Sequence, residues 1–283
     1  MKQNLSRVII LALNFTAQAT TFIPVSEVKI IQFINAQPKS DPSNLPNSAK
    51  LFPGVNREKM LWSILIPTLT ERRECFKTIF TKLLRQIEAA QLQEHVEIVF
   101  YRDNCDEPVG FKRNQLLAGA SGKYTCFVDD DDDIHDEYIT MIYEKLLEDK
   151  DCVKLVGIYN FDNKWQKVFI HSLSYRSYFE KNHVYYRPPN HLNPIRHSIA
   201  IQLKFPDAKN FGEDTDWAMQ ICNSGILQSE ASCDEPYYYY NFSPQKSVSN
   251  RRIQDPEKAK QLALQKELRD KALALITKSR QRQ

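Results

Sequence analysis

The sequence predicts an α/β fold: one catalytic domain in which a mostly parallel sheet is flanked by helices. Apolar runs of strand length alternate with stretches whose apolar residues recur at helical spacing, and polar or turn-forming residues end each run. The 283 residues, of which 42% are hydrophobic and 26% charged, also suffice to bury the core of one large domain. We expect this domain to occupy residues 60–250.

The first half of the domain supplies five elements in order. Residues 61–66 (LWSILI) predict a buried strand that ends at Pro67 and Thr68. The apolar positions 76, 79, 80, 83, 84 and 87 have the spacing of a helix packed on a sheet. A second strand covers residues 96–101 and closes at Asp103, a short helix covers 110–122, and a third strand covers 123–128. Strands separated in this way by helices predict a parallel sheet.

Five consecutive aspartates, at positions 129–133, follow the third strand directly, and a helical pattern resumes over residues 136–149. Carboxylates at this density repel one another, so the run must be solvated, neutralised by a cation or partly protonated. The ends of the first two strands should lie at the same edge of the sheet as the aspartates, and ligands bind at that edge in open α/β sheets. A solvated loop or an adventitious calcium site is the alternative interpretation.

A second acidic motif lies about eighty residues later, in NFGEDTDWAMQICNSG. The pattern predicts a helix from about residue 213 to 223, with Gly225 as its stop signal. Glu213 and Asp214 fall in its first turn, where a helix dipole also favours acidic residues for purely structural reasons. The tyrosines at 237–240 predict a strand, and we assign them no role.

The two ends of the chain differ from the domain in composition. Residues 1–19 combine Lys2 and Arg7, a short apolar run and an A-x-A sequence, which predicts a cleaved signal peptide or an N-terminal anchor. Residues 20–59 are expected to be a linker, and residues 251–283 a basic helix that packs on the domain or contacts a membrane surface. A cleaved signal implies an exported or secreted protein, and an uncleaved one a cytoplasmic or membrane-associated protein.

Charge and cysteine usage narrow the possible partners. The net charge of +3 and the pI near 8.4 are too mild to indicate a nucleic-acid partner. The six cysteines form no CxxC pair and no Cys/His pattern of a structural zinc site. We expect several of them to be small buried hydrophobic residues rather than disulfides or metal ligands.

Several of these motifs together resemble the family 2 glycosyltransferases, which have the GT-A fold. The resemblance covers about residues 61–222 and rests on SILIPTLTERRE, the strand-terminal Asp103, GFKRNQLLAGASGKYTCFVDDDDD and FGEDTDWAMQI. An Asp-x-Asp motif after an apolar strand, followed by a Glu-Asp motif some eighty residues later, is fairly specific, whereas each piece alone is weak.

The resemblance implies an inverting, metal-dependent transfer of a sugar from a nucleotide-diphosphate donor, most simply a UDP-sugar, to a hydroxyl on a glycan, lipid or protein. It implies Mn²⁺ or Mg²⁺ as cofactor, since these cations take hard oxygen ligands and can neutralise a diphosphate leaving group. Asp131 would be the principal metal ligand, with Asp129 on the metal or the donor ribose. Asp132 would assist, and Asp130 and Asp133 would face solvent or cap the next helix.

The same resemblance assigns the remaining site residues. Asp214, beside Glu213, would be the general base for the acceptor hydroxyl. The nucleotide pocket would use Pro67, Thr68, Asp103, Lys112 and Arg113, although the first turn of a solvated helix is an alternative for the two basic residues. For the acceptor pocket we name His191, Asn193 and Trp217, the last with a place in the helix core as its alternative.

Two other functions remain open from the sequence. A sugar-phosphate nucleotidyltransferase also builds a metal-carboxylate site on an α/β sheet, but it normally has a glycine-rich phosphate loop, and no glycines cluster after the first strand here. A catalytically silent glycan-binding module with the same fold is the second alternative. Retention of Asp214 favours an enzyme.

Overall fold

The computed structural model describes residues 29–33, 59–162, 164–209 and 211–243. The expected signal segment, most of the expected linker and the expected C-terminal helix lie outside these residues. Among the described residues, no helix combines the length and the apolar character needed to cross a membrane.

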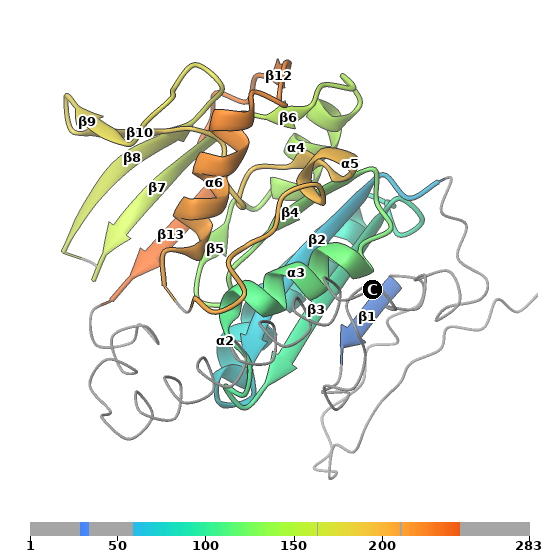
Figure 1. Ribbon diagram of the computed structural model, residues 1–283. Helices are drawn as coiled ribbons and strands as arrows, with labels where there is room; N and C mark the ends of the chain where they lie inside the picture. Colours follow the sequence, from blue (N-terminus) through green and yellow to red (C-terminus); the bar gives the residue numbers. More distant parts are fainter. Residues whose placement is uncertain (1–28, 34–58, 163, 210, 244–283) are drawn as a thin grey trace, which may run out of the picture.

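The main sheet has seven strands and confirms the mostly parallel α/β prediction (Figure 1). Its centre is parallel throughout, because β2 pairs in parallel with both β3 and β4, and β1 pairs in parallel with β3. Only β11 runs antiparallel to its neighbours β4 and β6. In spatial order the strands are β1 (Lys29–Phe33), β3 (Val96–Asp103), β2 (Trp62–Leu69), β4 (Tyr124–Phe127), β11 (Ile195–Arg196), β6 (Cys152–Val153) and β12 (Glu230–Ala231).

Both faces of this sheet are covered, which explains why its central strands read as continuous apolar runs. Alternate residues of β2 enter opposite cores: Ile64 and Ile66 pack in one cluster, and Leu65 packs in the other. Buried residues of helices α2 and α4 pack in the first cluster, and those of α3 and α6 pack in the second. The helical elements are η2 (Thr70–Arg72), α2 (Arg73–Ala89), α3 (Val109–Gly119), α4 (Tyr138–Leu146), α5 (His197–Ala200) and α6 (Glu213–Ser224).

A second, six-stranded sheet stands beside the first and was not predicted, apart from the strand at the tyrosine run (Figure 1). Its β5 begins at the last aspartate of the acidic run, and β13 pairs antiparallel with β5. This pairing carries the tyrosine run to the acidic run. The strands in order are β5 (Asp133–Ile134), β13 (Tyr238–Phe242), β7 (Leu155–Phe161), β8 (Trp165–His171), β10 (Val184–Arg187) and β9 (Phe179–Lys181).

The structure differs from the expected elements at two places. Strand β2 continues through Pro67 to Leu69, whereas we expected it to stop there. Beyond Leu65, β2 pairs with β3 alone. Pro67 has no N–H to donate, and β4 loses no hydrogen bond because it does not pair with β2 at this position. Residues 29–33 fall within the expected linker but form β1 at the edge of the main sheet.

The cysteine prediction is confirmed in its main point. All six cysteines lie in the described part of the chain, and no disulfide joins any two of them; Cys126, Cys152, Cys222 and Cys233 are buried. Cys75 is exposed and Cys105 is half-buried.

Gly110, in the first turn of α3, allows a close backbone contact that the site depends on. An added Cβ would lie 2.1 Å from the carbonyl oxygen of Pro206, which precedes α6. An exposed helical Gly→Ala change normally stabilises a protein by about 1 kcal/mol. We expect Gly110→Ala instead to destabilise this protein by about 2 kcal/mol, as overpacking does. Urea unfolding checks this, and a gain in stability would contradict the contact.

Candidate active site

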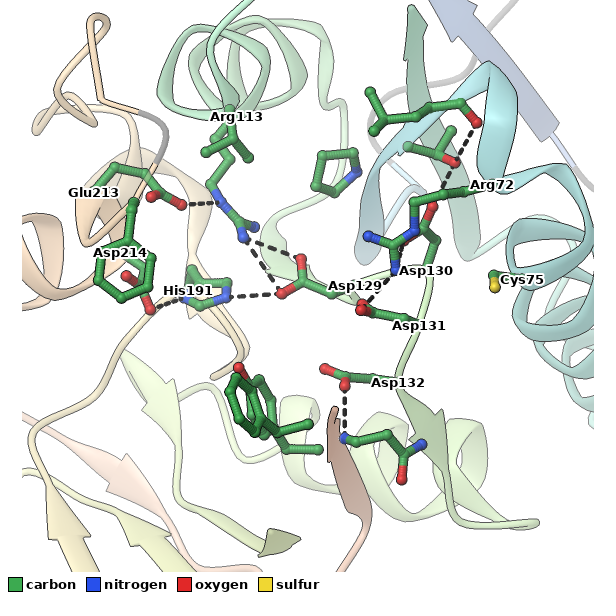
Figure 2. A pocket seen from close by; sticks show the side chains of 18 of the residues that line it. Arg72, Cys75, Arg113, Asp129, Asp130, Asp131, Asp132, His191, Glu213 and Asp214 are labelled. Carbon is green, nitrogen blue, oxygen red and sulfur yellow. Dashed lines mark hydrogen bonds and ion pairs between the residues drawn. The ribbon is translucent and has the colours of Figure 1, made fainter. Parts of the chain in front are cut away.

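A cavity of about 990 Å³ opens where the strands β2 and β4 end and α6 begins. The edge of the sheet predicted to bind ligands therefore carries residues of both acidic motifs. Figure 2 shows the two acidic motifs facing each other across the cavity. The lining acidic, basic and histidine side chains are Glu71, Arg72, Lys112, Arg113, Asp129, Asp130, Asp131, Asp132, Asp162, His191, Glu213 and Asp214.

Asp130 and Asp131 share one cation, Arg72. The guanidinium Nη2 lies 2.8 Å from Asp130 Oδ1 and 2.7 Å from Asp131 Oδ2 (Figure 2). The hydroxyl of Thr68 donates a 2.6 Å hydrogen bond to the other oxygen of Asp130. Asp130 is thus buried at the strand end, and our expectation that it faces solvent or caps a helix is wrong. The Asp131 side chain remains 38% exposed to the cavity.

Asp132 is held by the second sheet. The hydroxyl of Tyr238 donates to Asp132 Oδ2 at 2.7 Å, and the backbone N–H of Asn241 donates to Oδ1 at 2.9 Å. Tyr238 also accepts a hydrogen bond from the backbone N–H of Asp129 at 3.1 Å. The tyrosine run, to which we assigned no role, therefore fixes the backbone of the acidic run.

Asp133 points away from the other four aspartates. Its carboxylate pairs with Lys82 of α2 at 3.0 Å, and it does not line the cavity. Its half-exposed position agrees with the expectation for this residue.

Arg113 joins the two acidic motifs. Its Nη2 donates to Asp129 Oδ1 at 3.0 Å, and its Nε donates to Glu213 Oε1 at 3.2 Å (Figure 2). The guanidinium is buried and lies 4.9 Å from the ring centroid of Phe127. Arg113 therefore holds α6 and the end of β4 in a fixed relation.

His191 lies between the two carboxylates to which the resemblance gives chemical roles. Its Nε2 is 3.6 Å from Asp129 Oδ2, and its Nδ1 is 3.9 Å from Asp214 Oδ2. The side chain is 5% exposed, and both ring nitrogens are buried without a hydrogen-bond partner. Asp214 itself is 33% exposed and lines the cavity. The glycine before α6, Gly212, has φ of 75° and gives the chain the turn that aims this helix start at the cavity.

Three other predicted residues, Asp103, Asn193 and Trp217, lie behind the cavity rather than in its lining. Asp103 is buried and paired with Lys112 at 2.8 Å, so the alternative of a solvated first turn is wrong for Lys112. Asn193 is fully buried and donates to the carbonyl of Val153. Trp217 is 1% exposed and donates its indole N–H to the carbonyl of Leu203. Neither Asn193 nor Trp217 reaches the cavity, and Trp217 takes the core place that we gave as its alternative.

Burial and the repulsion between neighbouring carboxylates shift the pKa values of the acidic run. Burial raises the pKa of Asp130 to about 7, although Arg72 and Thr68 oppose the rise. Burial likewise raises the pKa of Asp131, against the effect of Arg72, and raises that of Asp132 further, with the charges of its neighbours adding to the effect. Burial also opposes the ionisation of Asp129, but Arg113 and His191 outweigh it and lower the pKa of this carboxyl.

These shifts make the stability of the metal-free protein pH-dependent. The folded state holds a proton on Asp130 up to about pH 7, whereas the unfolded carboxyl releases it near pH 4, so the free energy of unfolding falls as pH rises through this interval. For Asp130 alone we expect a loss of about 2 kcal/mol between pH 5 and 7.5. Urea unfolding at both pH values measures the loss, and Asp130→Asn should reduce it. An equal loss in this variant would contradict the assignment.

The acidic cavity fits a divalent cation in its donor chemistry. Eight carboxyl groups and three Lys or Arg side chains line the cavity, an excess of five acidic groups. An anionic diphosphate would therefore be repelled there unless a cation were added. The partly exposed Asp131 offers the hard oxygens that Mg²⁺ and Mn²⁺ prefer. No group of three or more His, Cys, Asp or Glu side chains forms a ready metal cage within the described ranges. Magnesium sites in proteins often use one or two carboxylates and complete the coordination shell with water and substrate phosphate oxygens.

Two functional residues escaped the sequence analysis. Arg72 lies in the quoted segment SILIPTLTERRE, but nothing in the local pattern separates it from Arg73. Tyr238 reaches the acidic run through the pairing of β13 with β5, which joins residues more than a hundred positions apart. Only the alternation of the tyrosine run, which predicts a strand, could have indicated the contact.

Comparisons with known proteins agree with the resemblance. Residues 112–204 match the family model described as Glycosyl transferase family 2. The glycosyltransferase GlyA of Streptococcus pneumoniae serotype 4 is 26% identical over 38% of this chain, and the match spans 18% of that relative's length. Among solved structures, S. aureus TarS 1-349 in complex with UDP covers 66% of this chain and 62% of its own, with 16% identity and a TM-score of 0.44. The complex of TarS with UDP-GlcNAc gives 15% identity and a TM-score of 0.44, with 65% and 59% of the two chains covered.

Proposed function

We propose that this chain, whose residues 112–204 match the family model of glycosyl transferase family 2, is an inverting, metal-dependent glycosyltransferase of that family. It transfers a sugar from a nucleotide-diphosphate donor, which we take to be a UDP-sugar, to a hydroxyl of an acceptor. The observation that carries the proposal is the pair of ion pairs made by Arg113, which brings the acidic run and the Glu-Asp motif to one cavity.

The donor diphosphate lies against the acidic run in this proposal. Asp131 is the principal ligand of Mn²⁺ or Mg²⁺, and Asp129 contributes an oxygen to the cation or to the donor ribose. The bound cation supplies Lewis-acid neutralisation of the leaving diphosphate. Asp132, fixed by Tyr238, keeps the backbone of the run in place. Pro67 and Thr68, which line the cavity, form part of the nucleotide wall.

Asp214 is the general base. Its carboxylate takes the proton from the acceptor hydroxyl while the hydroxyl oxygen bonds to the anomeric carbon and the bond from that carbon to the diphosphate oxygen breaks. Attack from the face opposite the diphosphate inverts the anomeric centre. Glu213, paired with Arg113, orients the helix start, and His191 lines the space between the base and Asp129.

Slow donor hydrolysis tests the proposal without knowledge of the acceptor. Purified protein is incubated with a panel of nucleotide sugars, with Mn²⁺ or with EDTA, and release of nucleoside diphosphate is measured. We expect metal-dependent release from at least one UDP-sugar. Release that is equal in EDTA would contradict the metal dependence. Absence of release from every donor, with acceptors from the glycan, lipid and protein classes also present, would contradict the activity.

A further inference from the structure

Arg72 is a cation placed where the acidic run is most open to the cavity. It is the last residue of η2, the turn that links the end of β2 to α2. Its side chain is 19% exposed, lines the cavity and bridges Asp130 and Asp131 (Figure 2). Burial works against its charge, and the two carboxylates more than compensate, so the pKa of the guanidinium is raised.

The position of Arg72 conflicts with the proposed cation. Its Nη2 is 2.7 Å from an oxygen of Asp131, the side chain to which the proposed function gives the metal. Two cations cannot occupy the same side of one carboxylate at ligand distance, because they repel and compete for the same lone pairs. A cation bound at the Asp131 oxygen that Arg72 contacts therefore requires Arg72 to move.

The other cationic side chains of the cavity are held by buried ion pairs and are not available to move toward a bound diphosphate. Lys112 is paired with Asp103 behind the cavity, and Arg113 is buried between Asp129 and Glu213. Of the Lys and Arg side chains that line the cavity in the described chain, Arg72 is the one directed at the two central aspartates. Asp130 also keeps a hydrogen bond from Thr68 on its other oxygen, so it retains a partner when Arg72 leaves.

We propose that Arg72 is an internal counter-cation that pairs with Asp130 and Asp131 before the donor binds and then transfers to the diphosphate of the incoming metal–nucleotide complex. The inference rests on the proposed function. A guanidinium suits both positions, since its forked donors match carboxylate and phosphate oxygens equally well. The exchange makes the metal bind poorly alone and well with nucleotide, because only the nucleotide offers Arg72 a new anionic partner.

Binding of Mn²⁺ to the full-length chain tests this directly. Free Mn²⁺ is followed by electron paramagnetic resonance in titrations with and without UDP, for the wild type, Arg72→Ala and Arg72→Lys. In Arg72→Ala we expect Mn²⁺ alone to bind about tenfold more tightly and Mn²⁺ with UDP about tenfold more weakly, the size expected for one hydrogen-bonded charge. Arg72→Lys keeps the charge but lacks the fork, so it should exclude Mn²⁺ as the wild type does while binding the UDP complex weakly.

Opposite changes in the two titrations distinguish the proposal from a structural role. Arg85→Ala, which removes an exposed arginine on the outer side of α2, is the matched control and should change neither. If Arg72→Ala weakens both titrations, or changes neither while the wild type binds Mn²⁺ and UDP together, the inference is wrong and the proposed function stands. If the wild type shows no joint binding, the metal dependence in the proposed function is wrong, and the inference with it.

Discussion

Replacing Asp214 with asparagine is expected to lower kcat for sugar transfer by about 100- to 10,000-fold, the usual contribution of a general base. Asparagine keeps the shape of the side chain but cannot accept the proton of the acceptor hydroxyl. The residue lies across the cavity from the acidic run, so binding of Mn²⁺ and UDP should be unchanged (Figure 2). Initial rates of transfer, with nucleotide affinity by calorimetry, measure the two effects separately.

Asp216→Asn is the matched control for this change. Asp216 lies in the same first turn of α6, but its carboxylate pairs with Lys209 and does not line the cavity. We expect transfer by this variant to remain within about twofold of the wild type, since the exposed ion pair contributes less than about 1 kcal/mol. Comparable losses in both variants would assign the effect to the helix start rather than to a base. Full activity of Asp214→Asn would exclude Asp214 as the base.

Replacing Asp131 with asparagine is expected to abolish metal-dependent turnover at the metal concentrations that saturate the wild type. The carboxylate is 38% exposed, lines the cavity and is the principal ligand in the proposed site. An amide oxygen carries no net charge and binds Mg²⁺ or Mn²⁺ far more weakly. We expect a rise of at least about 100-fold in the metal concentration needed for half-maximal rate, by analogy with losses of several kcal/mol at other charged contacts. The rate as a function of Mn²⁺ concentration measures it.

Asp133→Asn provides the control within the same run. Asp133 is the same residue type as Asp131 and lies two positions after it, but it pairs with Lys82 outside the cavity. Its metal dependence should match the wild type. An equal rise in both variants would show that total charge, rather than a specific ligand, governs the metal response.

The parallel part of the fold could be predicted because its signals are local. Strands β2, β3 and β4 are buried on both faces, so each reads as an unbroken apolar run, and the helices between them show one apolar stripe. The strand order predicted that the acidic run lies at the ligand-binding edge of the sheet, and the family resemblance added Asp214 to the same site. Asp129, Asp131 and Asp214 all line the cavity.

The second sheet and the ion pairs could not be predicted because they depend on distant contacts. β5 is two residues long, and its pairing with β13 is visible only in three dimensions. From the sequence, Lys112 and Arg113 could lie in a solvated helix turn, yet both are buried. Each pairs with a carboxylate that is distant in the sequence, by nine residues for Lys112 and by a hundred for Arg113. For the same reason the sequence offered Trp217 for the acceptor pocket, whereas its stacking on Phe205 places it in the core.

Isothermal titration of the protein with UDP, in the presence and absence of Mn²⁺, tests most directly whether the acidic run binds a nucleotide through a cation. The account predicts that Mn²⁺ strengthens UDP binding by at least about tenfold, which corresponds to about 1.4 kcal/mol, and that Asp131→Asn removes this gain. Equal UDP affinity with and without Mn²⁺, together with an unchanged affinity in Asp131→Asn, would contradict it.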